Sequence, residues 1–293
     1  MKILLLGANG QIGSELQRSL QPLGDVVSMT RSDCDFTQLD KLSARVREEK
    51  PNLIVNAAGY TNVEKAETEK ELAEQLNARL PERLAQLCHE MESRLVHFSS
   101  NYVYSGQGDK PFSEDSEPGP TTFYGNTKLA GDLAIQSYCN DFFIFRTGWV
   151  YSHEGRNILT DLLKSAKDHK SVRVCSTQVG APTPARLVAD IISTGLSRMH
   201  RRVLKVKPGI YHISTQGEAS QCDFAREIFR LRKAHQSVKV IPSGERKSPV
   251  SHPVNNRLQV SKLEDSFCVC LPSWQSQLAT LIQVPAQARN TES

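Results

Sequence analysis

The hydrophobic positions in the first half of the chain alternate between short continuous apolar runs and longer stretches with helical spacing. The apolar runs lie at residues 2–6, 25–29, 53–57, 94–100 and 142–146. Such runs are typical of strands that are buried on both faces of a parallel sheet. Helices are predicted between them at residues 14–20, 39–50, 67–91 and 124–138, with a break or a new start at Pro81. The alternation predicts βαβ units, and therefore an α/β fold with a doubly wound parallel sheet.

A glycine-rich turn follows the first apolar run directly. Glycine permits a tight turn, lets the backbone approach a pyrophosphate group and allows a helix to pack closely on a strand. The N-terminus of the helix that follows offers free N–H groups to phosphates. This arrangement predicts a dinucleotide-binding domain of the Rossmann type, although its Gly-x-x-Gly-x-x-Gly spacing differs from the general Gly-x-Gly-x-x-Gly pattern. The predicted cofactor contacts here are Gly7, Asn9, Gly10, Gln11, Ile12 and Gly13.

The pattern becomes less regular after about residue 150, where prolines and glycines divide shorter elements. The prolines in question are Pro182, Pro184, Pro208 and Pro242. We expect an NAD(P)-binding domain over residues 1–150, and a mainly substrate-binding lobe over 151–284 with some elements that return to the first domain. This smaller C-terminal lobe should cover the carboxyl ends of the strands, where ligands bind in open α/β sheets. Residues 285–293 are predicted to be a disordered polar tail.

The residues that follow the second apolar run decide between NADP and NAD. Arg31 offers a charged fork for a ribose 2′-phosphate, with the hydroxyl groups of Thr30 and Ser32 beside it. NADPH is therefore the predicted cofactor. Asp33 and Asp35 follow closely, and a carboxylate there accepts hydrogen bonds from the ribose of NADH, so NADH stays open as well. Further predicted cofactor contacts are Asp35 and Phe36 near the adenine, and Ala57, Ala58 and Gly59 after the third apolar run.

Tyr124 and Lys128 are four residues apart in a predicted helix, so they lie one turn from each other on the same face. A free tyrosine keeps its proton to a pH near 10. A neighbouring ammonium group favours the phenolate and is expected to bring that pKa toward neutral. Ser99 and Ser100, at the end of the fourth apolar run, are placed to supply a further hydroxyl donor. The spacing alone is common by chance, and its meaning comes from the predicted nucleotide site before it.

The composition indicates a soluble enzyme with neither a nucleic-acid nor a membrane partner. The chain has 293 residues, enough for a substantial core, and a net charge of only +4. The apolar start is too short for a signal peptide, and the seven cysteines are scattered, which suits reduced thiols in the cytoplasm. Cys268-Val-Cys270 lacks a second pair of ligands, and we interpret it as strand packing rather than a metal site.

Several stretches together resemble one enzyme family. The glycine turn, Asn56-Ala-Ala-Gly59, Ser99-Ser100 and Tyr124-x-x-x-Lys128 are similar to those of extended short-chain dehydrogenases/reductases. More specific stretches lie at residues 57–67, 99–104, 124–131, 145–151, 178–183, 255–258 and 271–274. With these, the chain resembles the dTDP-4-dehydrorhamnose reductase family, in order over nearly its whole length.

The resemblance implies a reaction in which NADPH reduces the 4-keto group of a dTDP-linked 6-deoxy sugar. It implies that Tyr124 supplies the proton and that Lys128 lowers the tyrosine pKa and binds the nicotinamide ribose, so both also contact the cofactor. Ser100 stands where the family usually has threonine, and would donate to the carbonyl oxygen. The implied substrate contacts are Ser100, Asn101, Tyr102 and Trp149. For Tyr102 and Trp149, packing in the core is the alternative.

Some positions depart from the family pattern. Asn101 replaces aspartate, Gly148 replaces serine, Gln221-Cys222 replaces an aromatic pair, and Arg186 replaces a glutamate. In some relatives that glutamate and a residue like Glu15 hold Mg²⁺ between subunits. A guanidinium cannot ligate a cation. We therefore expect no metal site and no metal-bridged dimer, and the assembly is predicted to be a monomer or a homodimer.

Three functions remain open at this point. The first is synthesis of dTDP-L-rhamnose from dTDP-4-dehydro-L-rhamnose for surface polysaccharide. The second is reduction of a different nucleotide 4-keto sugar. The third is a catalytically weak, cofactor-binding regulatory homologue. The presence of Ser100, Tyr124 and Lys128 together favours an enzyme, because a binding protein has no need of all three.

Overall fold

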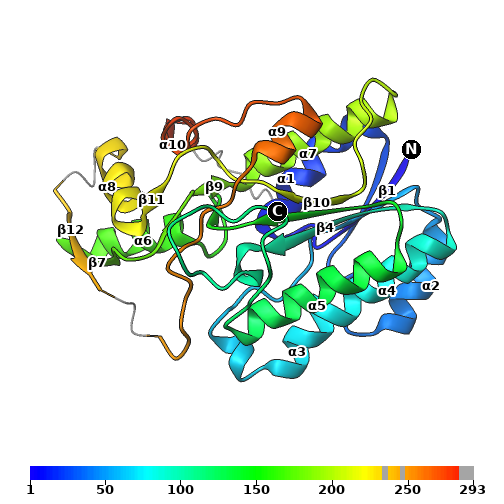
Figure 1. Cartoon of the computed structure of the whole chain (residues 1–293), viewed down its shortest axis with the longest axis horizontal. Helices are drawn as coiled ribbons and strands as arrows, with labels where there is room; N and C mark the ends of the chain where they lie inside the picture. Colours follow the sequence, from blue (N-terminus) through cyan, green and yellow to red (C-terminus); the bar gives the residue numbers. More distant parts are fainter. Residues whose placement is uncertain (233–236, 245–247, 284–293) are drawn as a thin grey trace, which may run out of the picture.

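The core of the protein is a sheet of six parallel strands (Figure 1). The computed structural model describes residues 1–232, 237–244 and 248–283, so the predicted tail at 285–293 lies outside the described residues. The strands are β1 (Lys2–Leu6), β2 (Asp25–Met29), β3 (Leu53–Asn56), β4 (Arg94–Ser100), β5 (Phe142–Thr147) and β10 (Gly209–His212). Their order across the sheet is β2-β1-β3-β4-β5-β10. The predicted α/β fold is confirmed.

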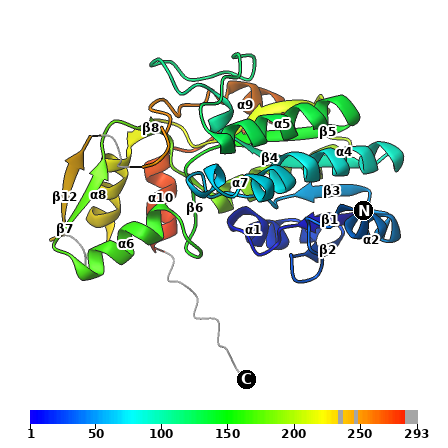
Figure 2. The same ribbon diagram turned by 90° about the horizontal axis from the view of Figure 1, so that it is seen from below.

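Helices cover both faces of the sheet (Figures 1 and 2). One face carries α1 (Gln11–Ser19), α7 (Ala185–His200) and α9 (Ser261–Phe267), and the other carries α2 (Leu39–Glu49), α4 (Leu80–Glu90) and α5 (Phe123–Tyr138). Successive strand residues point to opposite faces, so Ile3 and Leu5 join the first core while Leu4 and Leu6 join the second. Burial on both faces explains why the strands read as continuous apolar runs.

The strand order reverses next to β1. The chain runs from β1 outward to β2 and then returns to the other side of β1 with β3. In open α/β sheets, ligands bind at such a reversal, in a crevice outside the carboxyl ends of the strands. The glycine turn after β1 and Ala57-Ala58-Gly59 after β3 lie at this reversal of the strand order.

The stretch predicted as helical over residues 67–91, with a break or a new start at Pro81, changes its hydrogen-bond pattern along its length. A short helix α3 (Lys70–Glu74) continues into a π-helical segment (Gln75–Arg79), and α4 begins at Leu80. Pro81 lies in the first turn of α4, directly after the π-helical segment. The helical backbone thus runs without a gap from Lys70 to Glu90, and a π-helical segment stands where a break or a new start at Pro81 was predicted.

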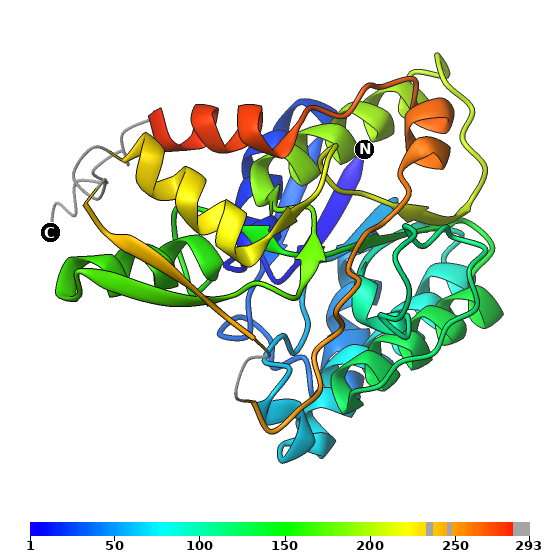
Figure 3. The ribbon, with the colours of Figure 1, turned by 60° about the vertical axis from the view of Figure 1, so that its left-hand side comes forward.

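A smaller lobe lies beyond the carboxyl ends of the strands (Figure 3). Its helices are α6 (Ile158–Asp168), α8 (Gln221–Leu231) and α10 (Trp274–Gln283). Its strand pairs are β6 (Val150–Tyr151) with β9 (Thr183–Pro184), β7 (Ser171–Cys175) with β12 (Lys239–Ser243), and β8 (Val179–Gly180) with β11 (Ala219–Ser220). The lobe has a hydrophobic core of its own, which includes Tyr151, Phe224 and Trp274.

Two further findings concern the sequence-based expectations. Cys268 and Cys270 are exposed and follow the end of α9 outside any strand, so their interpretation as strand packing is wrong. The local cause is that Cys268 adopts a left-handed conformation, φ 52°, which ends the helix. Within the described ranges, no helix is both long and apolar enough to cross a membrane.

Candidate active site

The glycine turn is shaped by close backbone contacts. Gly7 has a left-handed φ of +76°, and a Cβ there would lie 2.5 Å from the backbone nitrogen of Ala58. A Cβ at Gly13 would lie 2.0 Å from the carbonyl oxygen of Gly7. Gly10 caps α1 without a side-chain hydrogen bond, so the first N–H groups of this helix have no side-chain cap. This cradle and the positive end of the helix fit the pyrophosphate of a dinucleotide.

The predicted cofactor residues in this turn differ in their surroundings. Asn9 is exposed, whereas Gln11 and Ile12 are half-buried. Gln11 Oε1 accepts a hydrogen bond from Ser152 Oγ at 3.1 Å. The glycine turn and the lobe therefore meet through Gln11.

The loop after β2 holds its own carboxylates by local hydrogen bonds. The backbone N–H and hydroxyl of Thr30 donate to Asp33 at 2.8 and 2.7 Å, and they hold the pKa of Asp33 below its usual value. Thr37 does the same for Asp35. Arg31 is exposed between these groups. Both carboxylates near Arg31 therefore have partners within the loop.

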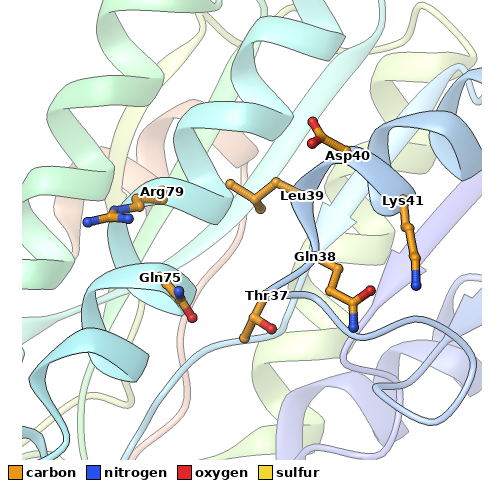
Figure 4. A pocket seen from close by; sticks show the side chains of 7 residues that line it. All are labelled: Thr37, Gln38, Leu39, Asp40, Lys41, Gln75 and Arg79. Carbon is orange, nitrogen blue, oxygen red and sulfur yellow. The ribbon is translucent and has the colours of Figure 1, made fainter.

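A pocket of about 530 Å³ opens beside this loop (Figure 4). It lies between the start of α2 and the π-helical segment before α4, and it follows Asp35 and Phe36 directly in the chain. Its lining residues are Thr37, Gln38, Leu39, Asp40, Lys41, Gln75 and Arg79. Phe36 is itself buried in the core beside Met29 and Leu42. No pattern in the sequence indicated this pocket, because a π-helical segment has no characteristic residue spacing.

The start of α5 is fixed by three contacts. The hydroxyl of Thr122 accepts from the Gly125 N–H at 3.0 Å, and Glu67 accepts from the Phe123 N–H at 2.8 Å. A Cβ at Gly125 would lie 2.3 Å from the carbonyl oxygen of Tyr102. The first turn of α5, which carries Tyr124, is thereby held against the segment that follows β4.

Tyr124 and Ser100 meet at this junction. The hydroxyl of Ser100 lies near enough to the Tyr124 phenol to lower its pKa. Ser100 also accepts from the Tyr102 N–H at 3.2 Å, which holds its side chain at the end of β4. Ser99 acts instead on Asp132, whose pKa it lowers, and its buried hydroxyl has no hydrogen-bond partner among the described residues. Of the two serines that the sequence offered, Ser100 is therefore the partner of the tyrosine.

Burial governs the charges of the Tyr124–Lys128 pair. It raises the pKa of Tyr124, and the nearby hydroxyl of Ser100 only partly offsets this. The expectation that Lys128 brings the tyrosine pKa down is not met in this structure, because burial and the charge of Asp132 raise that pKa and Lys128 is not among the groups that lower it. Burial also lowers the pKa of Lys128 to about 8, although Asp132 acts in the opposite direction. Tyr124 therefore keeps its proton at neutral pH, as a proton donor must.

The predicted substrate residues form a wall with residues from the lobe. Asn101 is buried and its amide nitrogen donates to Asn256 Oδ1 at 2.6 Å. A Cβ at Gly148 would lie 2.5 Å from Asn101 Oδ1, so these two departures from the family pattern touch each other. Trp149 has a left-handed φ of 50°, which is a strained conformation for a bulky residue and is typical of functional sites.

Tyr102 is held by residues that precede Asn256 closely in the chain. Its ring packs edge-on against the Tyr124 ring, with the centroids 5.5 Å apart. Its hydroxyl forms a hydrogen bond of 2.9 Å with His252 Nδ1, and His252 Nε2 lies 3.1 Å from Ser248 Oγ. The sequence analysis missed Asn256, His252 and Ser248. The stretch at 255–258 was a signal for the first of them, but it carried no assigned role.

Arg186 belongs to a surface network with acidic partners. It pairs with Asp190 at 3.9 Å, Asp190 pairs with Arg18 at 2.6 Å, and Arg18 lies 3.6 Å from Glu15. In the part of the chain that the structure describes, no group of three or more His, Cys, Asp or Glu side chains is arranged to hold a metal ion.

Comparisons with known proteins agree with one family. The profile of the RmlD substrate binding domain matches residues 1–286. The dTDP-4-dehydrorhamnose reductase of Escherichia coli (strain K12) is 38% identical over 288 residues, which cover 94% of this chain and 95% of that protein. The Bacillus subtilis (strain 168) spore coat polysaccharide biosynthesis protein SpsK is 29% identical over 90% of this chain and 91% of its own.

Solved structures extend the agreement to the fold. A dTDP-4-dehydrorhamnose reductase from Clostridium acetobutylicum superposes with a TM-score of 0.89 at 32% identity, and covers 96% of this chain and 98% of that one. The Bacillus anthracis reductase, solved in complex with NADP, gives a TM-score of 0.88 at 29% identity with the same coverage. This chain therefore belongs to the RmlD substrate-binding domain family and is an NAD(P)H-dependent oxidoreductase similar to dTDP-4-dehydrorhamnose reductase.

Proposed function

We propose that this protein uses NADPH to reduce the 4-keto group of a dTDP-4-keto-6-deoxy sugar, and that the reaction converts dTDP-4-dehydro-L-rhamnose to dTDP-L-rhamnose for surface polysaccharide. The observation that carries the proposal is the neighbouring pair of hydroxyl groups on Ser100 and Tyr124, with Lys128 one helical turn away. This group lies at the carboxyl ends of the strands, on the same edge of the sheet as the glycine turn.

Each residue of the site has a separate role in the reduction of the ketone. NADPH, when bound, supplies the hydride that forms the new C–H bond at the carbonyl carbon. As the carbonyl oxygen becomes negative, Tyr124 transfers its proton to it, and Ser100 stabilises the developing charge by a hydrogen bond. The Lys128 ammonium then stabilises the tyrosinate that is left, which recovers its proton from water. Asn101, Tyr102 and Trp149 form the proposed wall that orients the sugar.

The preference for NADPH over NADH is supported by the loop after β2. Arg31 is exposed and free to approach a 2′-phosphate, while Asp33 and Asp35 are engaged by Thr30 and Thr37. Carboxylates already held by local donors are less available to a ribose hydroxyl group. Turnover with NADH at a higher KM remains compatible with this arrangement.

The decisive experiment is product identification. The protein is incubated with dTDP-4-dehydro-L-rhamnose and NADPH, and the product is identified by NMR against authentic dTDP-L-rhamnose. The expected product is dTDP-L-rhamnose, and Tyr124→Phe should bind NADPH normally but form none. A wild-type protein that binds NADPH and oxidises it with no dTDP-4-keto sugar would instead be a regulatory homologue.

A second substrate is favoured by one observation. The contact between Asn101 and Gly148, both departures from the family pattern, changes the charge and shape of the wall beside Ser100. Reduction of a different nucleotide 4-keto sugar is therefore the alternative function. Competition between dTDP-4-keto sugars of both C5 configurations, followed by comparison of kcat/KM, distinguishes the two. A higher kcat/KM for any sugar other than the rhamnose precursor supports the alternative.

A further inference from the structure

A row of buried polar side chains lies behind the Tyr124–Lys128 pair, on the face of the sheet that α5 covers. Asn56 and His97 are register neighbours on β3 and β4, and both are fully buried. His97 Nε2 lies 3.4 Å from Lys128 Nζ, and His97 Nδ1 lies 3.1 Å from Asn56 Nδ2. The imidazole therefore contacts the lysine nitrogen, and the proposed reaction gives it no part.

The partners of His97 decide which ring nitrogen carries the proton. Asn56 Oδ1 accepts from the Ala58 backbone N–H at 3.2 Å, so the amide nitrogen of Asn56 faces His97 Nδ1. An amide nitrogen only donates, so Nδ1 is the acceptor and the proton of the neutral ring is on Nε2. Burial and the charge of Lys128 hold the pKa of His97 well below its usual value, so the ring is neutral.

This tautomer directs Nε2–H at Lys128. An ammonium group has only N–H donors and opposes another donor, whereas the free amine has a lone pair that accepts one. The other contact of Lys128 Nζ in the described structure is the Phe98 carbonyl oxygen, at 2.6 Å. Three further ionisable groups face this nitrogen or its partner: Asp132 favours the ammonium, Arg146 on β5 pairs with Asp132 at 3.0 Å, and Tyr124 is neutral.

We propose that His97 is a positioning residue that sets the protonation state of Lys128, and that Asn56 selects the tautomer through which it acts. Asn56 also holds Ala58, whose backbone nitrogen lies against Gly7 in the glycine turn. The pair thus connects the cofactor-binding turn to the lysine through two side chains. The kinetic consequence rests on the proposed function, but the tautomer does not.

A second buried histidine provides an internal reference for the test. His212 is equally buried, its Nδ1 lies 3.1 Å from the carbonyl oxygen of Gln259, and its Nε2 lies 2.7 Å from the Tyr104 hydroxyl. A carbonyl only accepts, so His212 carries its proton on Nδ1. The two histidines are therefore expected to show opposite tautomers in one spectrum.

The first experiment records two-bond ¹H–¹⁵N correlations of the histidine rings in the full-length wild-type protein at pH 7. His97→Gln and His212→Gln assign the two signals. We expect His97 with its proton on Nε2 and His212 with its proton on Nδ1. A proton on Nδ1 of His97, or an imidazolium at this position, overturns the proposal whether or not the protein is active.

The second experiment inverts the tautomer with Asn56→Asp. A carboxylate accepts from both the Ala58 N–H and the ring, which moves the ring proton to Nδ1 and turns an acceptor toward Lys128. We expect the His97 spectrum to change from the pattern of a ring protonated on Nε2 to that of a ring protonated on Nδ1. We also expect the high-pH limb of kcat to move upward by about one pH unit. The same substitution in a His97→Gln background measures the effect of the added charge alone, and a smaller shift is expected there. Equal shifts in both backgrounds contradict the proposal.

Discussion

The two faces of the six-stranded sheet differ at its carboxyl edge. On the face under α5, the strands end in buried polar residues: Asn56, His97, Ser99 and Arg146. On the face under α1, α7 and α9, the neighbouring strand positions belong to the hydrophobic core: Val55, Phe98 and Phe145. The members of the two sets are adjacent in sequence, because a strand directs successive side chains to opposite faces.

The difference shows how one strand serves two purposes. Phe98 and Phe145 stabilise the fold by burying apolar area, whereas His97 and Arg146, one residue away, contact the groups around the site. Buried polar groups cost stability unless they are hydrogen-bonded. His97 has partners on β3 and α5, and Arg146 has a partner on α5. We therefore expect substitutions on the α5 face to alter activity, and substitutions on the opposite face to alter mainly stability.

The largest effect is expected at the reacting group itself. Tyr124→Phe removes the proton donor, and kcat should fall by about 10²–10⁴-fold with little change in melting temperature. Tyr138→Phe is the matched control, since Tyr138 is on the same helix but is exposed. Steady-state oxidation of NADPH measures both. An unchanged kcat in Tyr124→Phe would contradict the claim that the α5 face carries the proton donor.

The next effect compares adjacent residues of β5. Arg146→Met leaves Asp132 buried without its charge partner, and should cost about 3–5 kcal/mol of unfolding free energy. Phe145→Ala should cost a similar amount through a cavity. A double variant distinguishes the two faces. Asp132→Leu combined with Arg146→Met should recover most of the stability but not kcat. Activity stays low because Lys128 loses the charge that favours its ammonium form.

Urea denaturation and kcat of the same preparations test this pair. Phe145→Ala should keep kcat near the wild-type value as long as the protein is folded. A double variant that regains full activity would mean that the polar row only supports the fold, and the contrast between the faces would be wrong.

The pH dependence of turnover gives a smaller effect. The pKa of Lys128 is lowered to about 8, so the ammonium form is present below that pH and is lost above it. Since burial raises the pKa of Tyr124, the limb belongs to the lysine. We expect kcat to be flat near neutral pH and to fall by about tenfold per pH unit well above 8. Phe145→Leu, on the apolar face, should leave the limb in place.

The smallest effect is expected outside both faces, at exposed Arg31. Arg31→Ala should raise the KM for NADPH by about fivefold, because solvent screens an exposed charge contact to roughly 1 kcal/mol. The KM for NADH should not change, since NADH has no 2′-phosphate. Arg201→Ala, another exposed arginine, controls for the loss of one positive charge. Equal increases for both cofactors would argue against a phosphate contact.

Much of the first domain was predictable because its signals are local. Lys2–Leu6, Asp25–Met29 and Arg94–Ser100 are strands at the predicted residues, and α5 begins one residue before its predicted start. Burial on both faces imposes a continuous apolar run on a central strand, and a glycine turn imposes its own spacing. The roles of the site residues, the domain limits, the assembly and the cytoplasmic location stay predictions.

The missed residues share long-range contacts. Asn101 meets Asn256, 155 positions away, and Tyr102 meets His252, 150 positions away. No spacing or periodicity reports such pairs. The direction of the Tyr124 pKa was wrong for a related reason, since burial depends on everything packed around the ring and not on Lys128 alone.

The sequence by itself determined the layout of strands and helices, the glycine turn, and the presence of Ser100, Tyr124 and Lys128 in one family pattern. These follow from interactions within a few residues, or from side chains whose chemistry is evident from their type. The tertiary structure alone decided that Ser100 rather than Ser99 reaches Tyr124, and that His97 and Asn56 lie behind Lys128. Those choices depend on which strands are neighbours and on which face a side chain points, and the folded sheet sets both.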